Sequence, residues 1–227
     1  MNKNAIVQIF IKAKKNQKNF LNNYHNTEVL RLSKILTKNY AKKVGAKYFF
    51  LTKPKIKFTH PCWERFQLFS KKWTGKFNNI LFLDTDIFPW PSAPNIFNFI
   101  DNTAFNSMDY YKDKIKYNLK IFNTGAFVLN EKSASCIRKY IKKKDWIKRI
   151  KKYNDWNDGI ELNYIIKKSR VKHHKLSYKW NTQNQFNAYF THLWGSRKKW
   201  SPNSFAIIKA RILCRYLNFK KLYLKIH

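Results

Sequence analysis

The chain is poor in glycine and cysteine, and it lacks a long apolar run. Its 227 residues include only five glycines, so each glycine is more informative than usual. The three cysteines, Cys62, Cys136 and Cys214, are far apart and odd in number. This pattern supports neither a disulfide framework nor a zinc ribbon, and it favours a reducing compartment.

No uncharged apolar stretch approaches the roughly 20 residues that are needed to cross a bilayer. The uncharged run 87–100 contains three prolines. The apolar segment 5–11 is short and has no small-residue cleavage site after it, so we expect no signal peptide. The sequence therefore predicts a cytoplasmic protein, and its positive charge allows peripheral contact with an anionic membrane.

Acidic residues are also scarce, with 12 Asp and Glu against 47 Lys and Arg, which gives a net charge of +35. Of the basic residues, 39 are Lys and 8 are Arg, and the chain has 25 Asn, a bias typical of an AT-rich genome. Proteins that recognise phosphates or bases rely more on the planar fork of Arg. We therefore expect no specific nucleic-acid partner. A basic nucleic-acid-binding module is the rival interpretation, supported by the charge and the aromatic content but by no standard motif.

Apolar residues make up 44% of the chain, which is enough for the core of one domain and argues against global disorder. Apolar runs and helical periodicity alternate along it. The predicted strands are 5–11, 48–51, 80–83, 103–108, 121–130 and 171–176, and the predicted helices are 29–44, 63–73, 133–144 and 159–168. This order predicts a single α/β domain with a mostly parallel sheet flanked by helices.

The last 24 residues form a basic segment that we separate from the domain. We assign 1–203 to the domain and 204–227 to a helical tail, in which apolar and basic residues are mixed. One interpretation is a terminal helix packed on the domain. The alternative is a basic helix that lies on a membrane surface.

The strongest motif is an apolar run, 80–83, that leads directly into Asp84-Thr85-Asp86. Ligands of open α/β sheets bind beyond the carboxyl ends of the strands. Side chains at i and i+2 of a strand share a face, so both carboxylates can meet one ion. Oxygen ligands suit Mg²⁺ or Mn²⁺, which commonly hold a substrate diphosphate. The alternative is a pair of aspartates that cap a loop.

A second motif lies near the end, where His192 is followed by Gly195, Lys198 and Trp200. Histidine is a common metal ligand, glycine allows close backbone approach to a ligand, and a lysine can reach a phosphate. Alternatively, His192 has a purely structural role, and Lys198 is one of the 39 lysines of the chain with no role in a site.

Two further motifs carry polar residues. Asn123 and Thr124 precede Gly125 and an apolar run. This pattern is typical of a turn that enters a buried strand. Alternatively, the side-chain amide of Asn123 binds a polyhydroxylated ligand. Asp158 and Glu161 are neighbours on a predicted helix. They form either an acidic helix start or carboxylates of a site.

Together with Trp180-Asn181, the order and spacing of these motifs resemble the GT-A fold nucleotide-sugar glycosyltransferases. The likeness is strongest to family 8, which includes glycogenin and bacterial lipopolysaccharide galactosyltransferases, and it runs from about residue 5 to 200. The chain departs from that family at Gly159, where relatives have Gln, and at Lys199, where they have Pro. It is also shorter than most relatives.

The resemblance implies a GT-A (Rossmann-like) fold and a role for each matching residue. It implies a divalent ion, Mn²⁺ or Mg²⁺, on Asp84, Asp86 and His192. It implies a donor site formed by Asp84, Thr85, Gly195, Lys198 and Arg65. It implies sugar and acceptor contacts from Asn123, Thr124, Asp158, Trp180 and Asn181, and catalytic roles for Asp158, Asn123 and Glu161.

The function implied by the resemblance is that of a metal-dependent hexosyltransferase. It moves a sugar from a nucleotide-diphosphate donor, a UDP-sugar, to a hydroxyl of a glycan or glycoconjugate in polysaccharide biosynthesis, with retention of configuration. An inverting enzyme would instead need Asp158 or Glu161 as a base. A catalytically inactive GT-A-like scaffold is the remaining alternative.

Overall fold

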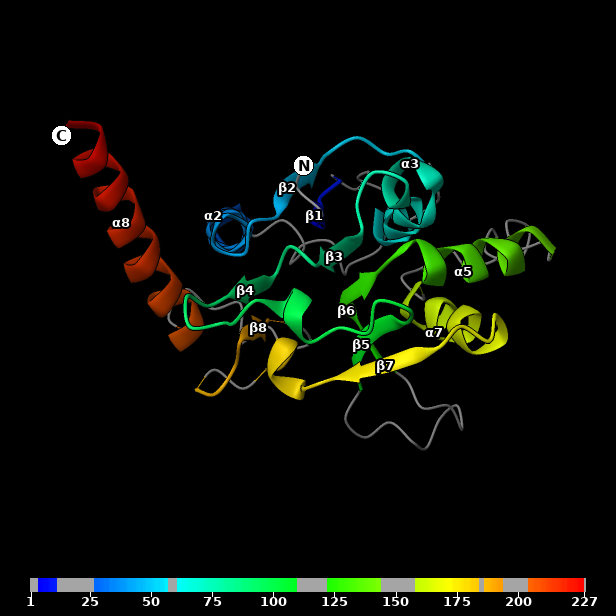
Figure 1. Ribbon diagram of the computed structural model, residues 1–227. Coiled ribbons are helices and arrows are strands. Elements are labelled where there is room, and N and C mark those ends of the chain that lie inside the picture. Colours follow the sequence, from blue (N-terminus) through cyan, green and yellow to red (C-terminus); the bar gives the residue numbers. More distant parts are fainter. Residues whose placement is uncertain are drawn as a thin grey trace, which may run out of the picture.

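A six-stranded mixed sheet forms the centre of the molecule (Figure 1). The computed structural model describes residues 4–11, 27–56, 61–109, 122–143, 158–183, 186–193 and 204–226. The strand order across the sheet is β2 (Lys47–Leu51), β1 (Asn4–Ile9), β3 (Asn79–Leu83), β6 (Phe122–Leu129), β5 (Phe105–Asp109) and β7 (His173–Leu176).

The strand pairings are mostly parallel, as predicted. Strand β1 is parallel to both β2 and β3, and β5 is parallel to β7. Strand β6 runs antiparallel to both of its neighbours, β3 and β5. The predicted α/β architecture, with a mixed sheet and flanking helices, is therefore confirmed.

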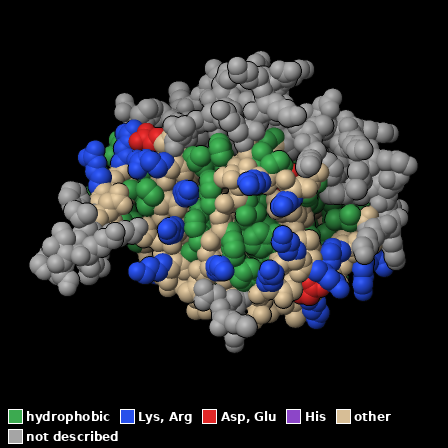
Figure 2. All heavy atoms as spheres, turned by 90° about the horizontal axis from the view of Figure 1, so that it is seen from above, with side chains coloured by type: hydrophobic (Ala, Val, Ile, Leu, Met, Phe, Trp, Pro, Cys, Tyr) green, Lys and Arg blue, Asp and Glu red, His purple; other side chains and the backbone are tan. Residues whose placement is uncertain are grey.

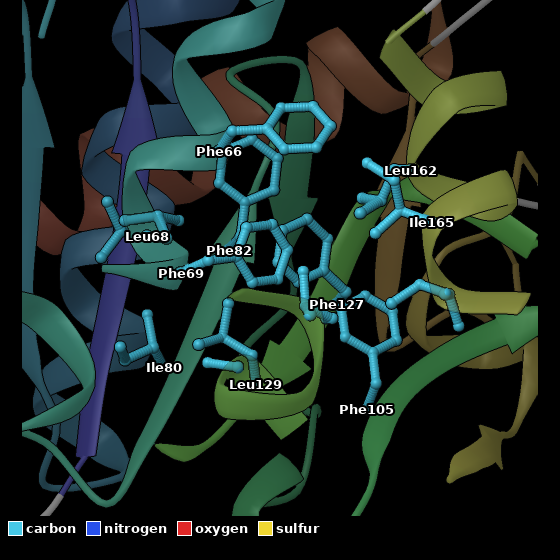
Figure 3. Packing of buried hydrophobic residues seen from close by; sticks show 14 of the residues in the cluster. Phe66, Leu68, Phe69, Ile80, Phe82, Phe105, Phe127, Leu129, Leu162 and Ile165 are labelled. Atoms are coloured by element: carbon cyan, nitrogen blue, oxygen red, sulfur yellow. The ribbon is translucent and has the colours of Figure 1, made fainter. Parts of the chain in front are cut away.

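The inner strands bury side chains on both faces of the sheet, which explains their continuous apolar sequence. Residues of β3 alternate between the two faces. Ile80 and Phe82 join one apolar cluster, and Leu81 and Leu83 join the other. Figure 3 shows the first cluster, in which the ring of Phe82 stacks on that of Phe127 at 5.0 Å between centroids.

Helices cover both faces. The first face lies under the 3₁₀ helix η1 (Pro61–Phe69), with α3 (Lys71–Thr74), α5 (Glu131–Lys143) and α7 (Asp158–Lys168). The second lies under α2 (Thr27–Lys43) and the short helices η2 (Ile96–Asn98) and η3 (Tyr178–Trp180). Helix α2 is followed by Gly45, whose φ of +65° is a conformation that glycine adopts without strain.

The helix predicted over 63–73 is wrong in type. The structure has a 3₁₀ helix over Pro61–Phe69, followed by a separate single turn of α-helix, α3. Trp63, Phe66 and Phe69 are three residues apart, which aligns them on one side of a 3₁₀ helix. All three are buried in the core, so burial favours the tighter helix.

Two short strands were not predicted from the sequence. Strands β4 (Ile87–Pro89) and β8 (Phe190–His192) pair antiparallel in a second sheet, with Ile87 opposite His192. Each has three residues, too few to show a periodicity. Their pairing brings the end of β8 next to the residues that follow β3.

The C-terminal helix α8 (Phe205–Ile226) packs one face against α2. That face consists of buried apolar side chains, Ala206, Ile207, Ala210 and Cys214. Within the described part of the chain, no helix combines the length and the apolar character that crossing a membrane requires.

Candidate active site

The two aspartates of the strongest sequence motif lie where β3 ends. Asp84 directly follows β3, and its backbone N–H donates to the carbonyl of Gly125 at 2.7 Å. The chain then turns, so that the N–H of Ile87 donates to the carbonyl of Asp84 at 3.2 Å. Both carboxylates are therefore held at the carboxyl end of an inner strand, the usual place for a ligand site in such a sheet.

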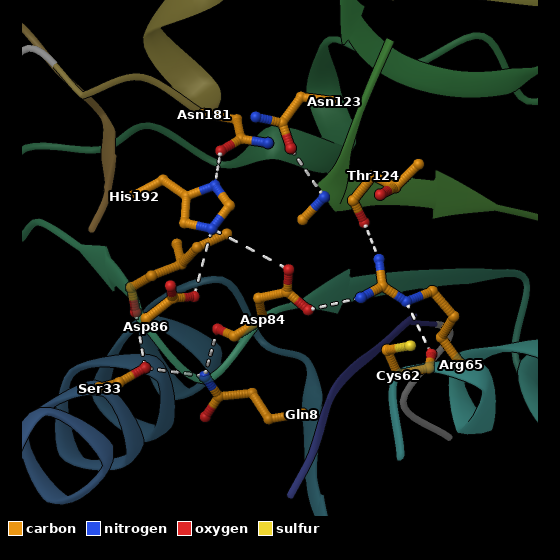
Figure 4. A network of polar contacts seen from close by, with 12 residues as sticks. Gln8, Ser33, Cys62, Arg65, Asp84, Asp86, Asn123, Thr124, Asn181 and His192 are labelled. Atoms are coloured by element: carbon orange, nitrogen blue, oxygen red, sulfur yellow. Dashed lines mark hydrogen bonds and ion pairs between the residues drawn. The ribbon is translucent and has the colours of Figure 1, made fainter. Parts of the chain in front are cut away.

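His192, the last residue of β8, joins these two aspartates (Figure 4). Its Nε2 lies 3.2 Å from Asp86 Oδ1 and 3.9 Å from Asp84 Oδ2. One ligand atom from each of the three residues lies within 4.8 Å of the other two. The structure thus brings together the three residues that were predicted to bind a metal, from positions more than a hundred residues apart.

The donor set fits a divalent cation. His192 Nδ1 contacts the side-chain oxygen of Asn181 at 2.8 Å, and because that oxygen can only accept, Nδ1 carries the proton. With the proton on Nδ1, the lone pair of Nε2 would be available to an ion that the two carboxylates hold. Two carboxylates and one imidazole suit an ion such as Mn²⁺.

Gly125 leaves the space in which these side chains meet. A Cβ atom at this position would lie 2.3 Å from His192 Cε1 and 3.0 Å from Asp84 Oδ2, so any larger residue would displace the histidine. The close approach, and not an unusual φ, explains the glycine in the motif 122–125.

Arg65 of η1 ties the carboxylates together from the side of the core. Its Nη2 lies 3.1 Å from Asp84 Oδ1, and its Nε lies 2.8 Å from Asp158 Oδ2. Its Nη1 also donates to the carbonyl of Thr124 at 2.7 Å, and its guanidinium lies over the ring of Phe82. Only 8% of the Arg65 side chain is exposed, so the contacts with these carboxylates are shielded from water.

The electrostatics of the site follow from this burial. Burial is the largest cause that raises the pKa of Asp84, and together with the neighbouring charge of Asp86 it brings this pKa to about 6 against the opposing effect of Arg65. Burial also raises the pKa of the Cys62 thiol, which lies beside Arg65 and Asp158. A bound cation would favour the ionised form of Asp84.

The turn after β3 is fixed by hydrogen bonds from residues that were not predicted from the sequence. The Gln8 side-chain amide donates to Ser33 Oγ at 2.9 Å and to the carbonyl of Asp84 at 3.2 Å. Ser33 Oγ donates to the carbonyl of Ile87 at 2.6 Å, and Tyr48 donates to Gln8 Oε1 at 2.8 Å. Gln8 was the one polar residue within the apolar run 5–11, which was the available signal.

The remaining predicted residues that the structure describes lie around this cluster. Thr85 is half-buried in the turn after β3. Asn123 accepts a hydrogen bond from the N–H of Gly125 at 2.8 Å. Glu161 is buried one turn along α7 from Asp158. Trp180 is buried against Tyr189 and Phe190.

One predicted contact residue has a different partner, and two predicted residues lie outside the described part of the chain. Asn181, which was expected near the sugar and acceptor, contacts His192 in the structure. Gly195 and Lys198, which were expected at the donor diphosphate, lie outside the described residues.

No family model and no curated protein matches this sequence. Solved structures do match its fold. One is a glycosyltransferase involved in glycosylation of the major capsid of PBCV-1, with 16% identity and a TM-score of 0.58 over 86% of this chain and 97% of that one. Another is the glycosyltransferase GlyE of Streptococcus pneumoniae TIGR4, with 12% identity and a TM-score of 0.59 over 97% of this chain.

This chain spans 64% of the length of GlyE. A third match is the catalytic domain of Drosophila β1,4-galactosyltransferase 7, solved with xylobiose, with 11% identity and a TM-score of 0.51 over 86% of this chain and 72% of that one. These likenesses show that the chain has the GT-A-like fold of these proteins.

Proposed function

We propose that this chain is a metal-dependent glycosyltransferase of the family 8 type. It transfers a sugar from a nucleotide-diphosphate donor, a UDP-sugar, to a hydroxyl of a glycan or glycoconjugate. The observation that carries the proposal is the group of Asp84, Asp86 and His192 at the carboxyl end of β3, in a GT-A-like fold. The order of the sequence motifs supports the family.

The three ligands would hold Mn²⁺ or Mg²⁺. When bound, the ion neutralises the charge that develops on the leaving diphosphate. Asp84 and Asp86 contribute the charged oxygens, and His192 contributes a neutral nitrogen whose direction Asn181 fixes. Gly195 and Lys198 belong to this proposal as further contacts of the diphosphate.

Asp158 is the proposed contact for a sugar hydroxyl. Its Oδ2 is engaged by Arg65 at 2.8 Å, so the carboxylate is a fixed group rather than a mobile one. Asn123 and Thr124 lie on β6 beside Gly125, on the strand next to β3. The retaining course that the family implies needs no base from the protein, because a phosphate oxygen of the donor helps to remove the acceptor proton.

The test is a screen of nucleotide-sugar hydrolysis with Mn²⁺ present, which identifies the donor without knowledge of the acceptor. We expect metal-dependent hydrolysis that is abolished in Asp86→Ala and in His192→Ala, both with an unchanged circular dichroism spectrum. Asp101→Asn is the matched control, since Asp101 pairs with Lys172 in a different loop. If activity survives both Asp86→Ala and His192→Ala, the proposed metal site is wrong.

The rival interpretations have less support. On the face shown in Figure 2, Lys and Arg side chains lie mostly singly among apolar and neutral ones, unlike the continuous basic stripe of a nucleic-acid-binding surface. An inactive scaffold would bind UDP with Mn²⁺ and hydrolyse no sugar nucleotide. The same screen, combined with a UDP-binding titration, distinguishes that case.

A further inference from the structure

Helix α8 carries a second apolar face, opposite the one that packs on α2. Its exposed apolar side chains are Phe205, Ile208, Ile212 and Tyr216, of which 49%, 41%, 65% and 62% is accessible. Spacings of three and four residues place them along one side of the helix. At the start of this stripe, the ring of Phe205 stacks on that of Phe186, which is 85% exposed.

A basic pocket of about 120 Å³ lies between α2 and α8, beside this stripe. It is lined by Glu28, Arg31, Arg211, Cys214, Arg215 and Asn218. Three of the eight arginines of a lysine-dominated chain therefore meet here. Arg guanidinium groups bind phosphate with two parallel hydrogen bonds, which a Lys ammonium group cannot do.

The pocket has an excess of positive charge. Glu28 pairs with Arg211 through two contacts, at 2.7 and 2.6 Å. Glu28 is the one acid among the described residues that line the pocket, and it offsets a single guanidinium. Arg31 and Arg215 then leave the pocket with an excess positive charge, which attracts an anionic phosphate group such as the singly charged phosphodiester of a lipid headgroup.

The pocket and the stripe form one continuous surface. Arg215 lies three residues after Ile212 and directly before Tyr216, so it borders the stripe on the pocket side. On the other side, Lys209 lies over the ring of Trp90 at 4.4 Å. The segment 204–227 has six Lys and Arg and no acid.

We propose that α8 docks this protein on an anionic phospholipid surface. The pocket of Arg31, Arg211 and Arg215 binds the phosphate of a lipid headgroup, and the stripe enters the boundary between headgroups and acyl chains. Amphipathic helices with basic flanks bind membranes in this way. Charge selects this occupant, because a net charge of +35 opposes a second copy of the chain.

The experiment is sedimentation of the full chain with vesicles of phosphatidylcholine, alone or mixed with phosphatidylglycerol. We expect binding to the mixed vesicles only. Arg31→Gln/Arg215→Gln should weaken it about 30-fold, because each charge at the surface contributes about 1 kcal/mol. Arg31→Lys/Arg215→Lys should retain part of the affinity, and Ile212→Ser/Tyr216→Ser should lose it at physiological salt.

The matched control is Lys167→Gln/Lys168→Gln, which removes two exposed charges from α7, across the molecule from α8 in Figure 1. It should leave vesicle binding nearly unchanged. An equal loss in this control would overturn the proposal in favour of diffuse charge. An unchanged affinity in the stripe variant would also overturn it.

Two further results would assign the surface to another occupant and reject the proposal. One is stabilisation by inorganic phosphate that depends on Arg31 and Arg215, without vesicle binding. The other is a dimer that the stripe variant abolishes in sedimentation velocity. Hydrolysis of soluble nucleotide sugars should be unaffected by all of these variants, so failure here is distinguishable from failure of the proposed activity.

Discussion

The end of β3 and the edge between α2 and α8 carry opposite excesses of charge. At the end of β3, among the described residues, Asp84, Asp86 and Asp158 bring three carboxylates to the site, and one guanidinium, that of Arg65, contacts two of them. At the edge, three guanidinium groups surround a single carboxylate. The first arrangement favours a bound cation, and the second favours a bound anion.

The two guanidinium groups also differ in burial, with 8% of the Arg65 side chain and 33% of the Arg211 side chain exposed, and the pKa values of their partner acids shift in opposite directions. The pKa of Asp84 is raised to about 6, with burial as the largest cause, although Arg65 lies beside it. The hydrogen bond from Arg211 lowers the pKa of Glu28, which is partly solvated. A guanidinium partner alone therefore does not decide the sign of the shift: at Asp84, desolvation and the nearby charge of Asp86 together outweigh the effect of Arg65.

The largest expected effect is on stability, in Arg65→Gln. Removing the guanidinium leaves the carboxylate of Asp158 buried without its partner, which should lower the free energy of unfolding by about 3–5 kcal/mol. The control is Arg211→Gln at the exposed edge, which should cost far less because water solvates Glu28. Urea unfolding measures both. Equal losses would contradict the contrast between the regions.

The next effect is on metal affinity, in Gly125→Ala. The added methyl would lie 2.3 Å from His192 Cε1, so the imidazole must move away from the carboxylates. We expect Mn²⁺ to bind about 100-fold more weakly, at the upper end of effects from residues that orient ligands. Electron paramagnetic resonance of free Mn²⁺ measures this affinity.

Gly159→Ala is the matched control for that change. Its added Cβ would meet Thr124 Oγ1 at 3.0 Å, a side-chain atom that can move, and alanine favours the helix in which it lies. Its Mn²⁺ affinity should stay close to that of the wild type. If Gly125→Ala also bound Mn²⁺ normally, His192 would not be a ligand.

A smaller loss, about tenfold in Mn²⁺ affinity, is expected for Asn181→Ala, because the hydrogen bond that orients His192 is removed. Asn181→Asp retains the acceptor oxygen and should restore binding. An unchanged Mn²⁺ affinity in Asn181→Ala would contradict this role.

The sequence predicted the parts of the buried region that depend on local pattern. The apolar run of β3 and the two carboxylates after it were visible, because a doubly buried strand is continuous in sequence. The motif that begins at His192 made this residue a candidate metal ligand, and the resemblance alone placed it with the two aspartates. Nothing local indicated that β8 would pair with β4, since each has only three residues.

The rest depended on contacts between distant segments. Arg65 was expected near the donor, but its two carboxylate partners come from the turn after β3 and from α7. The 3₁₀ helix that carries it was predicted as an α-helix, because three-residue and four-residue spacings overlap in a short window. The pocket at α8 was not predicted, because its arginines are 180 positions apart, Arg31 on α2 and Arg211 on α8.

The smallest effect is expected at the exposed edge, in Glu28→Gln. The change removes the acid from the pocket, so affinity for phosphatidylglycerol vesicles should rise about fivefold, the equivalent of one added charge. Stability should fall slightly at neutral pH, because the variant lacks the ion pair between Glu28 and Arg211. The lowered pKa of Glu28 means that this pair stabilises the wild-type fold above the ordinary pKa of glutamate, and that the stabilisation is lost as the pH falls. Glu131→Gln on α5 changes the net charge equally, far from the pocket. If both variants raise vesicle affinity by the same factor, net charge and not the pocket governs binding.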